Sequence, residues 1–201
     1  MPTITGFSKV SVANMALSLI GARSRISSFD ENSAEAEQMR LWYEVSRAQV
    51  LQAYDWPFAR RRIALPLSAI DPPDQWGFRY DRLTDMIQMR YIWNPGGEDL
   101  DALPFDQEQD DNGNLTIVTN VENAVAIYTA YDENIQNFNP LFAEALAAYL
   151  ASKIAFSLTG NQGIQSAMEQ RYIAVMRYAH AVSAGEKVDK APRDAEWIRN
   201  R

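Results

Sequence analysis

The stretch NSAEAEQMRLWYEVSRAQVLQAYDWPFARRRIAL, residues 32–65, predicts a long amphipathic helix that ends at a proline and leads into a strand. Asn32 is suited to cap the helix, with Glu35 three residues later as the second member of a capping box. Pro57 ends the helix, because it lacks an N–H and pushes Trp56 out of the α region. Apolar side chains recur at roughly helical spacing at Ala36, Met39, Tyr43, Val50, Leu51 and Tyr54.

The size and composition of the chain indicate an ordinary globular protein. Its 201 residues suffice for one domain with an elaboration or for two small domains. The chain has no cysteine, which excludes disulfides, thiol chemistry and cysteine zinc sites and fits production in a reducing cytoplasm. The N-terminal segment lacks the basic region of a signal peptide. We expect no membrane contact, because no apolar run approaches the ~20 residues of a membrane span.

The pattern of helix and strand signals predicts an α+β fold. A mainly α-helical bundle of about four helices is expected, with an inserted small antiparallel β-sheet region and an extended C-terminal tail. The first helix is expected to begin near Ser8 or Ser11. The third is capped by Asn139, has Pro140 in its first turn and ends at Gly160.

The boundaries of these regions follow from where helical periodicity is lost. Strands are expected between turn-rich segments at residues 60–65, 76–80, 86–93, 115–119 and 124–131. The resulting division is a helical bundle from residues 1–59 and 132–185, an inserted β region at 60–131, and a tail at 186–201.

Negative charge is concentrated in residues 98–111, which hold seven acidic side chains and no basic one. The seven are Glu98, Asp99, Asp101, Asp106, Glu108, Asp110 and Asp111. Without them, the acidic residues of the chain would equal its 19 basic residues, so the net charge of −7 belongs to this one segment. A protein that grips a phosphate backbone would show a basic stripe instead. We predict a solvated loop or, if many copies face a shared channel, a wall that repels DNA.

Few residues are candidates for catalysis. His180 is the only histidine, which excludes a His-rich metal site. Neither a G-x-S-x-G elbow nor a glycine-rich phosphate loop is present. The acidic segment could supply the two carboxylates of a glycosidase, but seven carboxylates in fourteen positions make that signal unspecific.

Two further features concern surface contacts. The arginine triplet at 60–62 resembles a nucleic-acid patch, but alternation along a strand leaves only two cations on one face. Ion pairs with Asp55, Asp81 or Asp85 are therefore the favoured interpretation. The polar tail carries one apolar pair, Trp197 and Ile198, and a lone tryptophan in such a segment is typical of an interface anchor.

Several segments, taken in order and spacing, resemble the tail tubular protein A family, the head-to-tail adaptors of short-tailed, podovirus-type bacteriophages. The resemblance covers nearly the whole chain, and its motifs are specific only in combination. They are VANMALSLIGA at 12–22, ISSFDE at 26–31, the helix at 34–54, WPFAR at 56–60, WGFRY at 76–80 with Leu83 and Asp85, and the helix at 145–158.

The resemblance implies a structural virion protein, made in the host cytoplasm and built into the phage neck, that is not an enzyme and needs no cofactor or metal. It implies a homo-oligomeric ring, twelvefold in this family, between the portal protein and a tail nozzle protein of the tail tubular protein B type. Double-stranded DNA would pass through the ring without sequence-specific binding.

The regions that meet these partners are expectations as well. The β region is the candidate for the nozzle side, and the candidate portal contacts in the tail are Arg193, Glu196, Trp197, Ile198 and Arg199. Two alternatives stay open at this point. One is a tail-associated glycan hydrolase that uses carboxylates of the acidic segment, and the other is a connector or stopper protein of another tail type.

Overall fold

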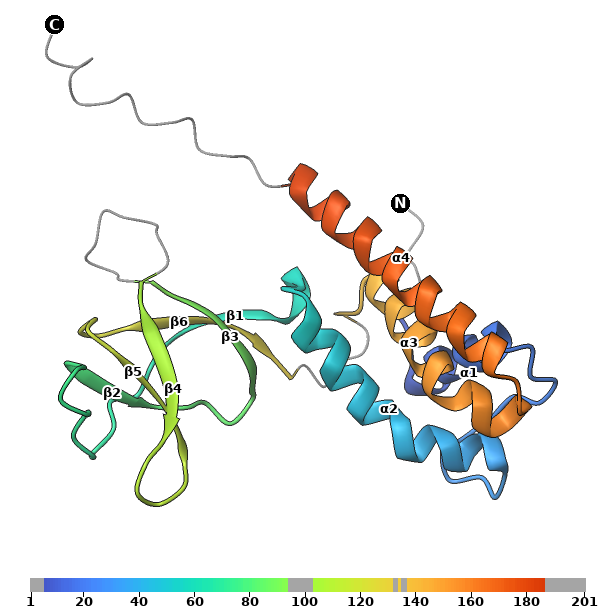
Figure 1. Ribbon diagram of the computed structural model, residues 1–201, viewed down its shortest axis with the longest axis horizontal. Helices are drawn as coiled ribbons and strands as arrows, with labels where there is room; N and C mark the ends of the chain where they lie inside the picture. Colours follow the sequence, from blue (N-terminus) through green and yellow to red (C-terminus); the bar gives the residue numbers. More distant parts are fainter. Residues whose placement is uncertain (1–5, 94–102, 132–133, 135–136, 187–201) are drawn as a thin grey trace, which may run out of the picture.

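Four α-helices and six strands make up the residues that the structure, a computed structural model, describes: 6–93, 103–131, 134 and 137–186. The α+β class predicted from the sequence is confirmed, with helices at both ends of the chain and strands between them (Figure 1). The elements are α1 Lys9–Leu19, α2 Ala34–Ala53, the 3-10 turn η1 Pro57–Ala59, β1 Arg60–Ala64, β2 Phe78–Asp81, β3 Met86–Trp93, β4 Phe105–Gln109, β5 Leu115–Thr119, β6 Val125–Ala130, α3 Pro140–Thr159 and α4 Gln162–Glu186.

The ends of the helices follow local side-chain chemistry. Ser8 caps α1 in a capping box with Ser11, and Asn139 caps α3, as predicted. Gly160 ends α3 in the left-handed conformation, with φ +66°. The predicted cap of α2 is wrong by one residue, because Ser33 rather than Asn32 accepts the hydrogen bond from the first turn. Glu35, the proposed partner in a capping box, therefore no longer stands at the third helical position.

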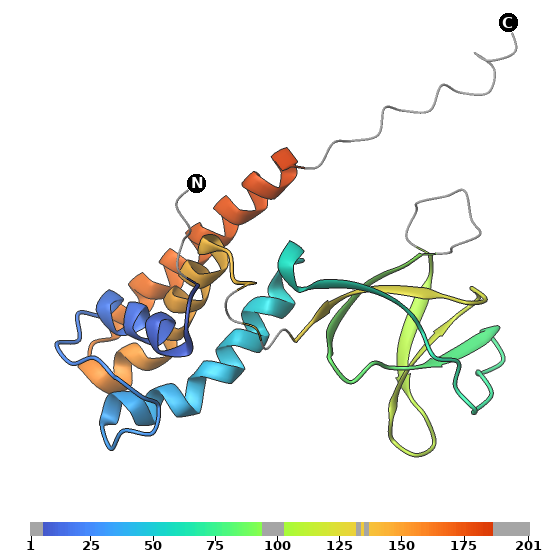
Figure 2. The ribbon, with the colours of Figure 1, turned by 180° about the vertical axis from the view of Figure 1, so that it is seen from behind.

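The helix α3 is the centre of the bundle, and α1, α2 and α4 pack around it (Figures 1 and 2). By length and composition it is the one helix of the described residues that could cross a membrane. Most of its apolar surface is buried against the other helices, as in the core helix of a bundle. Its mean hydropathy is therefore explained by its central position.

The inserted region contains two three-stranded antiparallel sheets, where the sequence predicted one. Their strand orders are β1–β6–β3 and β2–β5–β4. Isolated bridges join the sheets at both ends, Leu67 to Tyr80 and Ile92 to Leu103. The strands thus surround a hydrophobic cluster separate from that of the bundle, and form a small barrel-like module. The buried members of this cluster are Leu65, Tyr80, Met86, Met89, Ile92, Ile117, Val121, Ala124, Ala126, Tyr128 and Ala130.

The bundle is joined to the barrel at Trp56, where the chain leaves α2. The buried indole donates a hydrogen bond to the carbonyl of Val50, with 2.9 Å between the two atoms. Its ring meets that of Phe142 in α3 edge-on, at 5.1 Å between centroids. Arg90 of β3 then closes the end of α2 by donating to the carbonyl of Tyr54 at 2.7 Å and to two further carbonyls of its last turn. These carbonyls would otherwise lack partners, as at any helix end.

A second contact between bundle and barrel is centred on Glu44 of α2. Lys9 of α1 lies 2.5 Å from this carboxylate, and the hydroxyl of Tyr131, the residue after β6, donates to it. The buried guanidinium of Arg47 lies over the Tyr131 ring, 4.4 Å from its centroid. Burial alone would raise the pKa of Glu44, but the hydrogen bonds from Lys9 and Tyr131, together with the charges of Lys9 and Arg47, outweigh it and lower that pKa.

The Arg90 contacts predict a measurable loss on substitution. We expect Arg90→Gln to lower the free energy of unfolding by about 1.5–3 kcal/mol, because hydrogen bonds from a charged donor are lost and helix carbonyls are left unpaired. The control Arg62→Gln, on β1 of the same sheet, should cost less than about 1 kcal/mol, since it removes only a cation–π contact with Trp93. Urea denaturation measures both variants, and equal losses would contradict the capping role.

The Glu44 cluster predicts a pH dependence with a defined sign. Because the folded-state pKa of Glu44 is below its unfolded value, the carboxylate stabilises the fold at neutral pH. That contribution is lost as the pH falls from about 4.5 through the lower folded pKa. The wild type should therefore melt above Glu44→Gln at neutral pH, and the two should converge on acidification. The Tm of both proteins, measured by thermal denaturation across this pH range, tests the prediction. A difference in Tm that stays constant with pH would contradict it.

Candidate functional site

The structure describes part of the residues singled out from the sequence. The tail candidates Arg193, Glu196, Trp197, Ile198 and Arg199 lie outside the described residues, as do Glu98, Asp99 and Asp101. The other four acidic residues, Asp106, Glu108, Asp110 and Asp111, lie on β4 and on the turn that joins it to β5.

The prediction that this segment is a solvated loop is wrong for residues 105–109, which form β4. The strand pairs antiparallel with β5, from Phe105 opposite Thr119 to Gln109 opposite Leu115. Its sequence FDQEQ carries one apolar residue, and an edge strand needs few, so hydrophobic periodicity could not reveal it. A signal was available in the turn residues Asp-Asn-Gly ahead of an apolar strand, which predict a hairpin and therefore a partner strand before the turn.

Two of the acidic side chains help to hold the hairpin together, and Asp106 accepts a hydrogen bond only from the adjacent N–H of Gln107. Asp110 shapes the turn by accepting hydrogen bonds from the backbone N–H groups of Asn114, at 2.8 Å, and Asn112, at 2.9 Å. These bonds lower its pKa. Glu108 lies 3.1 Å from the guanidinium of Arg79, a buried residue of β2 on the far side of β5. The hairpin thus uses carboxylates to hold its own geometry.

This arrangement does not favour acid–base chemistry in the described part of the segment. A general acid needs a raised pKa. Among the described residues, the carboxyl groups whose pKa values are displaced are Glu31, Glu44 and Asp110, and all three pKa values are lowered. A nearby hollow of about 430 Å³ contains no carboxylate among its lining residues, which are Arg82, Leu83, Thr84, Gln109, Gly113, Asn114 and Leu115. The described residues also contain no cluster of three or more His, Asp or Glu side chains that could hold a metal ion.

The arginine triplet of β1 forms the local contacts expected of it. Arg60 pairs with Asp55 at 2.5 Å and Arg61 with Asp85 at 2.6 Å, which confirms two of the predicted ion pairs. The third arginine of the triplet lies over the ring of Trp93, with its guanidinium carbon 4.8 Å from the ring centroid. Each of these exposed cations thus has a partner within the chain, which favours the ion-pair interpretation.

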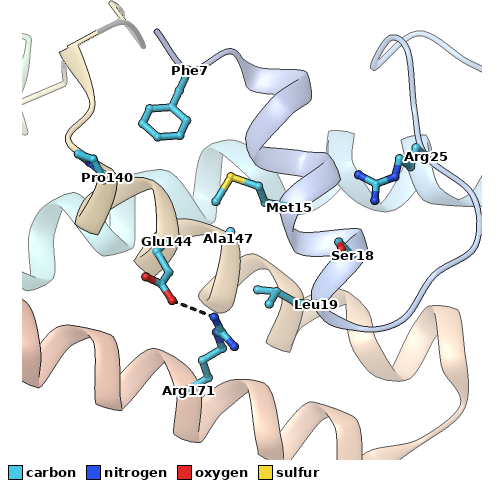
Figure 3. A pocket seen from close by; sticks show the side chains of 9 residues that line it. All are labelled: Phe7, Met15, Ser18, Leu19, Arg25, Pro140, Glu144, Ala147 and Arg171. Carbon is cyan, nitrogen blue, oxygen red and sulfur yellow. Dashed lines mark hydrogen bonds and ion pairs between the residues drawn. The ribbon is translucent and has the colours of Figure 1, made fainter. Parts of the chain in front are cut away.

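A groove of about 460 Å³ lies between α1, α3 and α4 (Figure 3). Its apolar lining consists of Phe7, Met15, Leu19, Pro140 and Ala147. At its rim Glu144 of α3 and Arg171 of α4 form an ion pair at 2.9 Å. Arg25, which follows α1, also lines the groove and forms no ion pair within the described part of the chain. A second hollow of about 350 Å³ continues from the same ion pair to the exposed Tyr178.

Another surface of the bundle exposes large apolar side chains, and we call it the apolar face. Its members come from α2, α3 and α4 and are Leu41, Val45, Phe156 and Ile173, with exposed fractions of 60%, 48%, 55% and 40%. A surface of this kind on a small protein marks an interaction site more often than scattered single residues do.

The contacts of Tyr149 show that α2 and α4 both border the side of α3 on which Phe156 lies. Its hydroxyl donates to the side chain of Gln49 in α2 at 2.8 Å, and its ring lies 4.8 Å from that of Tyr172 in α4. Leu41 and Val45 precede Gln49 by two turns and one turn, and Phe156 follows Tyr149 by two turns. The sequence did not reveal this face, although Leu41 and Val45 stand four residues apart and off the buried stripe of their helix, which was a usable signal.

Comparison with known proteins adds no identity to these observations. No protein-family model matches the chain, and no curated protein sequence is significantly similar to it. The structural evidence on function therefore comes only from the geometry of the described residues. It contains a groove and exposed apolar side chains on the bundle, and an acidic hairpin in which Glu108 and Asp110 hold the local geometry.

The role of Glu108 can be separated from that of its neighbours on the same strand. Glu108→Gln leaves the buried Arg79 without its counter-charge, and we expect a loss of about 1–2 kcal/mol in the free energy of unfolding. Asp106→Asn, at an exposed position two residues earlier, should change it by less than about 0.5 kcal/mol. Urea denaturation of both variants tests this difference, and equal stabilities would exclude the structural role given to Glu108.

Proposed function

We propose that this protein is a structural component of a phage virion, a head-to-tail adaptor that forms a ring between the portal and the tail nozzle. The observation that carries the proposal is the ordered set of segments that resemble the tail tubular protein A family. They occur in family order from residue 12 to residue 158, and their combined order and spacing are more specific than any one of the short motifs.

Most of these segments coincide with features on which the packing depends. Residues 12–22 form most of α1 and the turn that ends it, where Gly21 has φ +75°. The side chain of Asn14 exchanges two hydrogen bonds with the backbone of Ile26, at 2.8 and 2.9 Å, and so ties α1 to the segment 26–31. WPFAR at 56–60 is the joint between bundle and barrel. A resemblance placed on such positions supports a shared architecture.

The two-part body also suits a mechanical role. A connector must transmit a fixed geometry from one partner to the next, and contacts from Arg90 and Arg47 hold barrel and bundle together. On this proposal the barrel faces the nozzle and the tail beyond α4 reaches the portal. The acidic segment adds negative charge to the ring, which discourages passing DNA from binding wherever that segment faces the channel.

Assembly with the portal is the direct test. Light scattering of the purified full-length protein, alone and mixed with its portal protein, should show a large complex of fixed ratio when both are present. Removal of residues 194–201 should weaken that complex while helical circular dichroism is kept, because the described helices end before this segment. A monomer that ignores the portal would contradict the proposal. A different protein bound below the ring would indicate a connector of another tail type.

A further inference from the structure

We propose that, in the unassembled protein, the segment beyond α4 turns back along that helix and seats Trp197 in the hollow between α3 and α4. The occupant of the hollow is residues 194–199 of the same chain, which lie outside the described part of the structure. The inference concerns the isolated chain. It goes beyond the proposed function, because it gives the tail a binding surface on its own bundle.

The hollow lies beside the stretch of α4 that leads toward the tail. Its volume is about 350 Å³, and it continues from the groove at the ion pair of Glu144 and Arg171 (Figure 3). Tyr178 is the last residue of α4 that lines it and is 61% exposed. In the part of the chain that the structure describes, Tyr178 takes part in no ring contact and no hydrogen bond. The lining residues are Leu141, Glu144, Arg171, Ala174, Val175 and Tyr178.

Trp197 is suited to fill this hollow. With Ile198 it forms an apolar pair in an otherwise largely polar tail, and a buried indole removes a large area from water with few rotatable bonds to order. Among the large apolar side chains that the described residues expose, Tyr178 is the nearest to the tail in sequence. An aromatic anchor therefore meets an unpartnered aromatic ring at the first apolar surface that it reaches.

The length of chain between helix and anchor allows this return. α4 ends at Glu186, and Figures 1 and 2 show that it continues past the other helices before it ends. Tyr178 lies eight residues before that end, or about 12 Å along the helix. Trp197 lies eleven residues beyond it, which span up to about 36 Å when extended. The surplus is sufficient for a turn, and Pro192 lies within the connecting stretch.

The tether also decides how strong the contact must be. Two groups joined by a short flexible connection meet at an effective concentration in the millimolar range. A contact with a dissociation constant of about 1 mM, which would be negligible between separate molecules, is then occupied for a large part of the time.

The charges of the segment and of the surface are complementary. Residues 194–199 carry two carboxylates and one cation, which are Asp194, Glu196 and Arg199. The hollow and the adjoining groove carry the reverse, two cations and one carboxylate, which are Arg25, Arg171 and Glu144. On its return the segment runs from Tyr178 toward Arg171, so that Arg199 comes after the anchor and meets Glu144. This order of charges favours the docked segment over an uncharged one.

The indole resonance of Trp197 tests the contact directly. In ¹H–¹⁵N spectra of the full-length protein, where Trp197→Phe assigns it, this peak should differ in position from that of a synthetic peptide of residues 187–201. Tyr178→Ala should move it to the peptide position. The matched control Phe156→Ala, at an aromatic residue that is 55% exposed elsewhere on the bundle, should leave it in place. A wild-type peak already at the peptide position would overturn the proposal.

Disulfide trapping tests which face of α4 the segment occupies, in a chain that has no cysteine of its own. Ala195→Cys lies two residues before Trp197, on the same side of an extended segment. Combined with Val175→Cys in the hollow, it should form an intramolecular disulfide at least about fivefold faster than with Arg177→Cys, because the tethers are nearly equal and only docking differs. Arg177 is exposed and points about 160° away from Val175 around the helix. Equal rates would contradict the docked arrangement.

Docking also gives the tail two competing uses, and this consequence rests on the proposed function. If the portal binds the same tail, Trp197 must first leave the hollow. Tyr178→Ala should then raise the affinity for the portal, by at least about twofold if the wild-type tail is docked half of the time. Phe156→Ala should not change it.

The outcomes keep the two proposals apart. An indole peak that responds to Tyr178→Ala supports docking even if no portal complex forms, in which case only the adaptor proposal fails. A portal complex that forms while the peak ignores Tyr178→Ala supports the adaptor and overturns the docking.

Discussion

The burial of Trp56 is the constraint on which the rest of the molecule depends. α2 ends at Ala53, ahead of Pro57, and the indole of Trp56 turns back under that helix, where its N–H donates to the carbonyl of Val50 and its ring packs on Phe142. A buried indole needs a partner for its N–H, and the helix supplies it only if the chain bends at this place. The bend fixes the direction in which β1 leaves the bundle and the position at which α3 packs against α2.

Because of this bend, two hydrophobic cores behave as parts of one body. Each core could be filled without the other, yet Arg90 reaches from the barrel to the open end of α2, and Arg47 of α2 lies buried against Tyr131. Separation of the two parts would leave carbonyl groups and a buried cation without partners, and such groups are costly when they are not satisfied. The coupling therefore comes from a few polar contacts placed at the joint.

The sequence predicted those features of the fold that are decided locally. Pro57, Asn139 and Gly160 each act on the backbone next to them, and the five expected strands appear within two residues of their predicted limits. β4 and the closure of the barrel could not be predicted in this way, because they depend on partners distant in sequence, such as Ile92 opposite Leu103. The same holds for the two bundle surfaces. The exposure of Phe156 depends on how the other helices are arranged around α3, and the periodicity of the sequence does not predict that arrangement.

The central position of α3 also decides how the surfaces of the bundle lie relative to one another. A helix buried on almost all sides exposes only narrow strips, and here one strip, with Glu144, borders the groove while another, with Phe156, belongs to the apolar face. Both the groove and the exposed apolar side chains therefore involve the helix that forms the core of the bundle. Protein interiors are close-packed and yield little to strain, so the angle between the two surfaces is held by the core itself.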